Sequence, residues 1–149
     1  MTIGRPWRLT GRLRVALPPE QAWRLFTARG EEEWVDGWEP RFPGPVDDDT
    51  EPGVVWQTGH GFEHTLWLVL DRDPGRRVSY PRVTPHDRAG TVTVTLAPAA
   101  DGGSDVEVTY VLTALTPDAD ARLAEFAAGY DAFLASWADA IATHLAGTG

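Results

Sequence analysis

The sequence predicts an α+β fold in which a run of antiparallel strands packs against a long C-terminal helix. Short alternating or β-branched segments, separated by glycine, proline and aspartate turns, follow one another between residues 54 and 112. A helical segment with one continuous apolar stripe then closes the chain, from Pro117 to Leu145. A helix of this length after so many strands has to lie across a curved sheet, and such an arrangement encloses a cavity.

The N-terminal part is expected to contain one strand and two short helices. Residues 7–16 alternate in polarity, which is typical of a strand, and a pair of prolines ends this segment. Proline suits the first turn of a helix, so residues 19–26 are predicted to be helical, with Gly30 as the stop. The acidic segment 31–35 is predicted to form a second helical turn, because negative charge is favourable at a helix N-terminus.

Five more strands are expected in the middle of the chain, over residues 54–58, 63–70, 77–83, 91–96 and 106–112. In the segment 91–96, threonine alternates strictly with valine or leucine, so the apolar face is predicted to be buried.

The two-residue period of a strand also orients individual side chains. It places Tyr80 and Arg82 on one face, and it turns Tyr110 inward with its valine and leucine neighbours. The facing of Trp67 stays open, because residues 66–70 are apolar on both faces.

The closing helix has clear start signals. Thr116 is a suitable N-cap, Pro117 suits the first helical position, and Asp118 favours the positive end of the helix dipole. Gly129 lies in the middle, where it costs about 1 kcal/mol relative to alanine. It is either a tolerated weakness or a position where the backbone passes close to a ligand or a strand.

Composition excludes several classes of function. The net charge of −9 makes nucleic acid and anionic membrane surfaces unsuitable partners. The chain has no cysteine, which excludes disulfides and thiolate chemistry, and it has no lysine, which excludes Schiff-base chemistry. The absence of lysine and asparagine beside abundant alanine, glycine and arginine suggests a GC-rich, bacterial coding sequence. We expect one domain over residues 1–149, without signal peptide or membrane span, in the cytoplasm.

Aromatic side chains are the main candidates for a binding site. The chain has seven tryptophans, and several of them are spread over the predicted turn, strands and closing helix. Rings with one polar atom suit a pocket for a large, flat, partly oxygenated ligand, although each of them alone could equally be core. The predicted pocket aromatics are Trp34, Trp38, Trp56, Trp67, Tyr80, Tyr110, Phe126, Tyr130 and Trp137.

Two further side chains join this set. Arg82 and Tyr80 form a guanidinium and phenol pair that could hold an enol or carboxylate oxygen, although a rim salt bridge is the alternative for Arg82. His64 begins an apolar run and is expected to be partly buried as an acid–base group, the alternative being a solvated histidine.

No metal and no cofactor is predicted. Residues 60–64 spell H-x-x-E-H, an inverted zinc-protease motif, but that motif needs a helix, and glycines mark this segment as a turn between strands. The acidic run 47–51 lacks the ligand spacing of a calcium loop and is predicted to be a solvated turn.

The order of elements resembles the helix-grip fold of the START-like, or SRPBCC, superfamily. The resemblance is carried by residues 17–26, the Glu33–Trp38 turn, residues 80–85 and residues 108–115, and it extends over nearly the whole chain. It implies a seven-stranded antiparallel sheet wrapped around a long C-terminal helix, with two short helices after the first strand and a deep pocket in between. Relatives include polyketide cyclases and aromatases, lipid and hormone carriers, heat-shock ATPase activators and antibiotic self-resistance proteins.

Three functions follow as hypotheses. The first is binding or sequestration of a hydrophobic, aromatic or polycyclic small molecule by a monomer or homodimer. The second is a cyclase-type or aromatase-type enzyme acting in the same pocket, with His64, Tyr80, Arg82 and Tyr110 as the first candidates; whether the chain is an enzyme is left open. The third is an interaction module like the chaperone ATPase activators, which predicts a packed interior.

Overall fold

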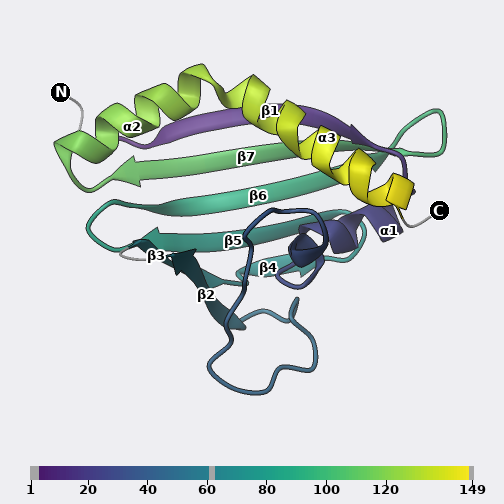
Figure 1. Cartoon of the computed structure of the whole chain (residues 1–149), viewed down its shortest axis with the longest axis horizontal. Coiled ribbons are helices and arrows are strands. Elements are labelled where there is room, and N and C mark those ends of the chain that lie inside the picture. Colours follow the sequence, from purple (N-terminus) through teal and green to yellow (C-terminus); the bar gives the residue numbers. More distant parts are fainter. Residues whose placement is uncertain (1–3, 61–62, 148–149) are drawn as a thin grey trace.

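The computed structural model describes residues 4–60 and 63–147. Seven strands form one antiparallel sheet, and the C-terminal helices lie across one of its faces (Figure 1). The strands are β1 (Trp7–Val15), β2 (Val55–His60), β3 (Glu63–Leu68), β4 (Asp71–Asp73), β5 (Arg77–Thr84), β6 (Arg88–Pro98) and β7 (Ser104–Ala114). The helices are α1 (Pro19–Ala22), α2 (Pro117–Ala128) and α3 (Tyr130–Gly147), with two 3-10 helices, η1 (Trp23–Phe26) and η2 (Gly30–Glu33).

The strand order is β1-β7-β6-β5-β3-β2, and β4 pairs with β5. The predicted α+β helix-grip fold is therefore confirmed. Strand β4 escaped the sequence analysis, because Asp71–Asp73 consists of charged residues and shows no apolar alternation. It is a strand only because it pairs with residues 77–79 of β5.

The two faces of the sheet differ in polarity. On β6, Val92, Val94 and Leu96 are buried, as predicted, while the threonines between them are half-buried. An antiparallel sheet with one covered face shows this alternation. The covered face and the two C-terminal helices enclose the core. None of the helices in the described part of the chain is long and apolar enough to cross a bilayer.

Helix α3 packs closely on β1 at Gly11. A Cβ atom at Gly11 would lie 2.5 Å from Cδ1 of Leu134, so a larger residue would force the Leu134 side chain to shift. The Tyr130 hydroxyl donates to the Val108 carbonyl oxygen at 2.7 Å and ties the start of α3 to β7. These contacts fix α3 on the inner face of the sheet.

The helical region divides at Gly129, where the sequence predicts one continuous helix. Gly129 has φ −102° and ψ 14° and separates α2 from α3. The Phe133 amide still donates to the Gly129 carbonyl oxygen at 2.9 Å, so the division is a bend. A Cβ at Gly129 would have the Glu125 carbonyl oxygen, 3.7 Å away, as its only close neighbour among the described residues. No strand of that part of the chain crowds it, which favours the tolerated weakness.

Replacing Gly129 by alanine is expected to raise the free energy of unfolding by about 0.5–1 kcal/mol, because alanine restricts the unfolded chain and suits a helix. Urea denaturation measures this change. Ala124→Gly, an exposed position in α2, is the matched control and should lower stability by a similar amount. A less stable Gly129→Ala variant would mean that the bend requires glycine.

Candidate functional site

A cavity of about 590 Å³ lies between the inner face of the sheet and helix α2. The apolar part of its wall consists of Tyr110, Leu112, Ala119, Leu123, Phe126 and Phe133. The polar part consists of Glu63, Arg82, Thr84, Asp87, Arg88 and Arg122, with Pro85 beside them. This volume is in the range of sites for small organic molecules.

The register of β5, β6 and β7 explains why space remains above the sheet. Gly90 pairs with Arg82 on one side and with Leu112 on the other, and cross-strand partners point to the same face. A Cβ at Gly90 would lie 1.8 Å from the Val111 carbonyl oxygen, so no side chain fits there. The layer of side chains is therefore interrupted between Arg82 and Leu112, both of which line the cavity.

Arg82 is a buried cation in the cavity wall, with an exposed fraction of 8%. Its Nη2 donates to Thr84 Oγ1 at 3.2 Å, and its Nε has no hydrogen-bond partner among the described residues. Burial, followed by the charge of Arg88, lowers the pKa of Arg82 to about 10, so the guanidinium stays charged at neutral pH. The alternative of a rim salt bridge is wrong, because Arg82 shares the inner face of β5 with Tyr80 and is buried with it.

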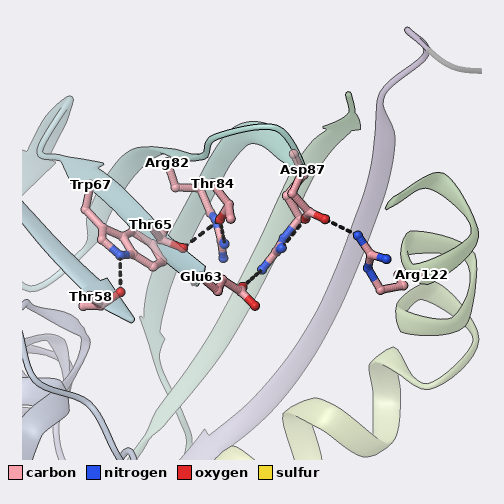
Figure 2. A network of polar contacts seen from close by, with 9 residues as sticks. Thr58, Glu63, Thr65, Trp67, Arg82, Thr84, Asp87 and Arg122 are labelled. Atoms are coloured by element: carbon pink, nitrogen blue, oxygen red, sulfur yellow. Dashed lines mark hydrogen bonds and ion pairs between the residues drawn. The ribbon is translucent and has the colours of Figure 1, made fainter. Parts of the chain in front are cut away.

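Two stacked tryptophans support this guanidinium (Figure 2 shows Trp67). The central carbon of the Arg82 guanidinium lies 4.8 Å from the Trp67 ring centroid. Trp67 stacks on Trp56 with 6.1 Å between centroids, and its Nε1 donates to Thr58 Oγ1 at 2.9 Å. Such a cation–π contact contributes about 0.5–2 kcal/mol. Trp67 thus faces inward, and both rings lie behind Arg82 without lining the cavity.

An ion-pair network occupies the polar side of the cavity (Figure 2). The two carboxylate oxygens of Asp87 accept hydrogen bonds, one from Arg88 and one from Arg122 of α2. Nη2 of Arg88 also lies 3.3 Å from Oε1 of Glu63 in β3. Burial acts to raise the pKa of Asp87, but the hydrogen bonds from the two arginines outweigh it and lower the pKa below its usual value. Asp87 is therefore a stable carboxylate that links the β5–β6 turn to α2.

Five of the predicted aromatic residues belong to the packing of the fold. Four of them donate to a backbone carbonyl oxygen: Trp34 to Leu25 and Trp38 to Ala28 at 2.7 Å each, Tyr80 to Phe26 at 2.6 Å, and Tyr130 to Val108 at 2.7 Å. The fifth, Trp137, lies between Trp34 and Phe133, with 5.3 Å from its centroid to each. The polar atoms of the first four are thus already used inside the protein, and a role for the five residues as ligand contacts stays a prediction.

His64 does not reach the cavity. It is exposed, because it alternates with the buried Thr65 along β3, so the expectation of partial burial is wrong.

His60 ends β2 and Glu63 begins β3, so the H-x-x-E-H segment belongs to two paired strands and not to a helix; residues 61–62 lie outside the described part. Among residues 4–60 and 63–147, no group of three or more histidine, aspartate or glutamate side chains is placed to hold a metal.

Three of the eleven predicted site residues line the cavity: Arg82, Tyr110 and Phe126. Burial raises the pKa of Tyr110, and the Arg82 guanidinium counteracts part of this increase, which places the phenol near the cation. Phe133 and Leu123 were missed as lining residues. They belong to the apolar side of the C-terminal helices, and no sequence signal separates a helix position over a cavity from one over a filled core.

Glu31 is a second feature that the sequence analysis missed. The sequence pattern places it only in the acidic start of a helical turn. In η2 its carboxyl comes close enough to Tyr80 and Tyr110 to raise the pKa of both phenols. Although part of the residue is still accessible, burial of the carboxyl raises its pKa to about 8. At neutral pH this group is mostly protonated.

Residues 16–142 match the family described as "Activator of Hsp90 ATPase homolog 1-like protein". The chain belongs to this family. Because the family is of the SRPBCC type, the predicted membership of the START-like superfamily is confirmed. No curated protein matches the chain in sequence.

Solved structures show the same fold at low identity. Protein MLL2253 from Mesorhizobium loti has a TM-score of 0.71 and 19% identity, over 96% of this chain and 99% of that one. The Aha1 dimer from Colwellia psychrerythraea has a TM-score of 0.63 and 16% identity, over 91% and 96%. DynU16, from the dynemicin biosynthetic locus, has a TM-score of 0.61 and 16% identity, over 93% of this chain and 46% of its own. At these identities the likeness establishes the fold alone.

Proposed function

We propose that this protein binds a hydrophobic, aromatic or polycyclic small molecule in the cavity beneath α2, as a carrier or sequestering protein. The observation that supports this most is that aromatic rings and a buried charged side chain line the same cavity. Tyr110, Phe126 and Phe133 meet edge to face, with 5.0–6.1 Å between centroids, and line the same cavity as the buried guanidinium of Arg82. Such a wall suits a flat apolar body that carries a polar group.

A relative gives this proposal a context. DynU16 is described as a protein of the dynemicin biosynthetic locus, and a polycyclic natural product would suit a cavity of this size. A role in self-resistance or transport of such a compound is inferred only from the shared fold. Binding of an apolar aromatic molecule does not depend on that role.

One observation favours the enzyme alternative. Glu31, with a pKa of about 8, lies near Tyr110, and a carboxyl that titrates near neutral pH is suited to proton transfer. Glu31 does not line the cavity, but it is a better candidate acid or base for a cyclase-type or aromatase-type reaction than the exposed His64. Incubation followed by native mass spectrometry separates the two functions: a carrier releases its ligand unaltered, while an enzyme changes its mass or ring count.

The family description favours a third function, activation of a chaperone ATPase. That function needs no ligand and is the one for which a packed interior was predicted, so the cavity supports ligand binding instead. The Colwellia relative is described as a dimer, and a homodimer remains the alternative to a monomer for this chain.

Binding of N-phenyl-1-naphthylamine, a neutral fluorescent probe, tests the proposed function. We expect saturable binding by the wild type and an affinity at least about tenfold lower for Ala119→Phe, because Ala119 is buried and lines the cavity and the added ring would occupy it. Ala124→Phe, the same change at an exposed position of α2, is the control and should bind like the wild type.

The smaller change Ala119→Leu covers the case in which the phenylalanine variant does not fold, and it should weaken binding less. The proposal fails if the folded wild type binds neither this probe nor other apolar aromatic compounds, or if both phenylalanine variants bind as the wild type does.

A further inference from the structure

We propose that the ligand of this cavity is an organic anion, specifically an aromatic carboxylate, whose acid group pairs with Arg82. The inference rests on the proposed function, since it names the chemical class of ligand for the same cavity.

The first argument is that Arg82 lacks a counterion. It is more than nine-tenths buried, yet none of the ion pairs among the described residues includes it. Its direct contacts are the ring of Trp67 and the hydroxyl of Thr84, neither of which carries a charge. The carboxylates of Glu63 and Asp87 raise its pKa only from a distance and form their ion pairs with other arginines. A buried cation without a partner costs free energy that a carboxylate in hydrogen-bonding contact offsets. No carboxylate of the described residues forms an ion pair with Arg82, so we infer that the carboxylate comes from a ligand.

The second argument is that the acidic groups of the cavity wall already have partners. Both oxygens of Asp87 are engaged by Arg88 and Arg122, and Glu63 lies against Arg88. The wall thus carries three arginines against two carboxylates, in a chain whose net charge is −9. A local positive excess in an acidic protein favours an anion in this cavity.

The third argument concerns shape. A guanidinium is a planar fork that matches the two oxygens of a carboxylate. Thr84 and Trp67 fix its position from behind, while its Nε remains without a hydrogen bond to any described residue. The rings of Tyr110 and Phe126 belong to the same wall and suit a flat aromatic body attached to the acid group.

A matched pair of probes tests this assignment: 2-naphthoate and its methyl ester, which share the ring system and differ in charge. Their affinities are measured at pH 7 by displacement of N-phenyl-1-naphthylamine. The wild type should bind the naphthoate at least about tenfold more tightly than the ester. In Arg82→Met this preference should disappear, while the affinity for the ester should stay within about twofold of the wild-type value.

Two further variants separate charge from position. Arg82→Lys keeps the charge and should retain part of the preference, because an ammonium lacks the planar fork. Arg8→Met removes an exposed arginine of β1 that does not line the cavity, so it should retain the full preference.

Each contrary outcome has a definite meaning. Equal affinity of the wild type for naphthoate and ester overturns the anion assignment and leaves the proposed function standing. Equal loss of both probes in Arg82→Met overturns it as well, because Arg82 would then only maintain the shape of the cavity. Failure of the wild type to bind the neutral dye and both probes overturns the inference together with the proposed function.

Discussion

Replacing Glu31 by glutamine is expected to raise the free energy of unfolding at pH 8 by on the order of 3 kcal/mol and to change it little at pH 4.5. The pKa of the Glu31 carboxyl rises in the folded protein from an ordinary 4.5 to about 8, because burial disfavours its charged form. Its contribution to stability is therefore fully present below pH 4.5 and is lost as the pH rises toward 8. Glutamine remains neutral and avoids this loss; the magnitude is reduced because part of Glu31 is accessible to solvent.

Urea denaturation at pH 4.5, 6 and 8 measures the effect as a difference that grows with pH. Glu32→Gln is the matched control, because Glu32 lies next to Glu31 in η2 but is exposed. It should show no such growth. A constant difference between Glu31→Gln and the wild type at all three pH values would contradict a buried, protonated carboxyl at this position.

Replacing Arg82 by methionine is expected to stabilise the ligand-free protein at pH 7 by about 2 kcal/mol. Burial lowers the pKa of this guanidinium to about 10, so at neutral pH the folded state holds a charge that it disfavours. The lost cation–π contact with Trp67 and the lost hydrogen bond to Thr84 offset part of the gain. Methionine keeps a flexible apolar side chain of similar length in the same place.

The signature of this effect is its weak dependence on pH between 5 and 9, because the penalty on Arg82 disappears only as the pH rises through about 10. Arg8→Met, at an exposed position of β1, is the control and should change stability by less than about 0.5 kcal/mol. A clearly less stable Arg82→Met variant would show that Arg82 serves the fold. If Arg82→Met is more stable and also loses carboxylate binding, Arg82 behaves as a functional residue. Such a residue lowers the stability of the protein when its ligand is absent.

Much of the architecture could be predicted from local pattern. The alternation over residues 91–96 predicted which face of β6 is buried, and the side chain of Thr116 accepts a hydrogen bond from the Ala119 amide at 3.1 Å, as an N-cap should. The two-residue period placed Arg82 and Tyr110 on the inner face, where both line the cavity. These features depend on neighbours along the chain, so the sequence alone contains them.

Features that depend on distant neighbours could not be predicted in this way. Strand β4 exists through its pairing with β5, and the network around Asp87 joins a turn, two strands and a helix. Glu31 and Glu32 are identical in sequence terms, yet only Glu31 is held against the aromatic interior. The sequence likewise does not distinguish the tryptophans from one another. In the structure, Trp34 and Trp38 donate to backbone carbonyl oxygens, while Trp67 stacks against the guanidinium of Arg82.

By itself, then, the sequence determined an α+β helix-grip fold, its buried faces and the presence of an arginine and a tyrosine on the inner side of the sheet. Only the tertiary structure decided which rings fill space and which border a cavity, that Arg82 has no carboxylate partner among the described residues, and that Glu31 is held in its neutral form. The physical reason is that burial and charge pairing are set by segments far apart in the chain, whereas periodicity and capping are set within a few residues.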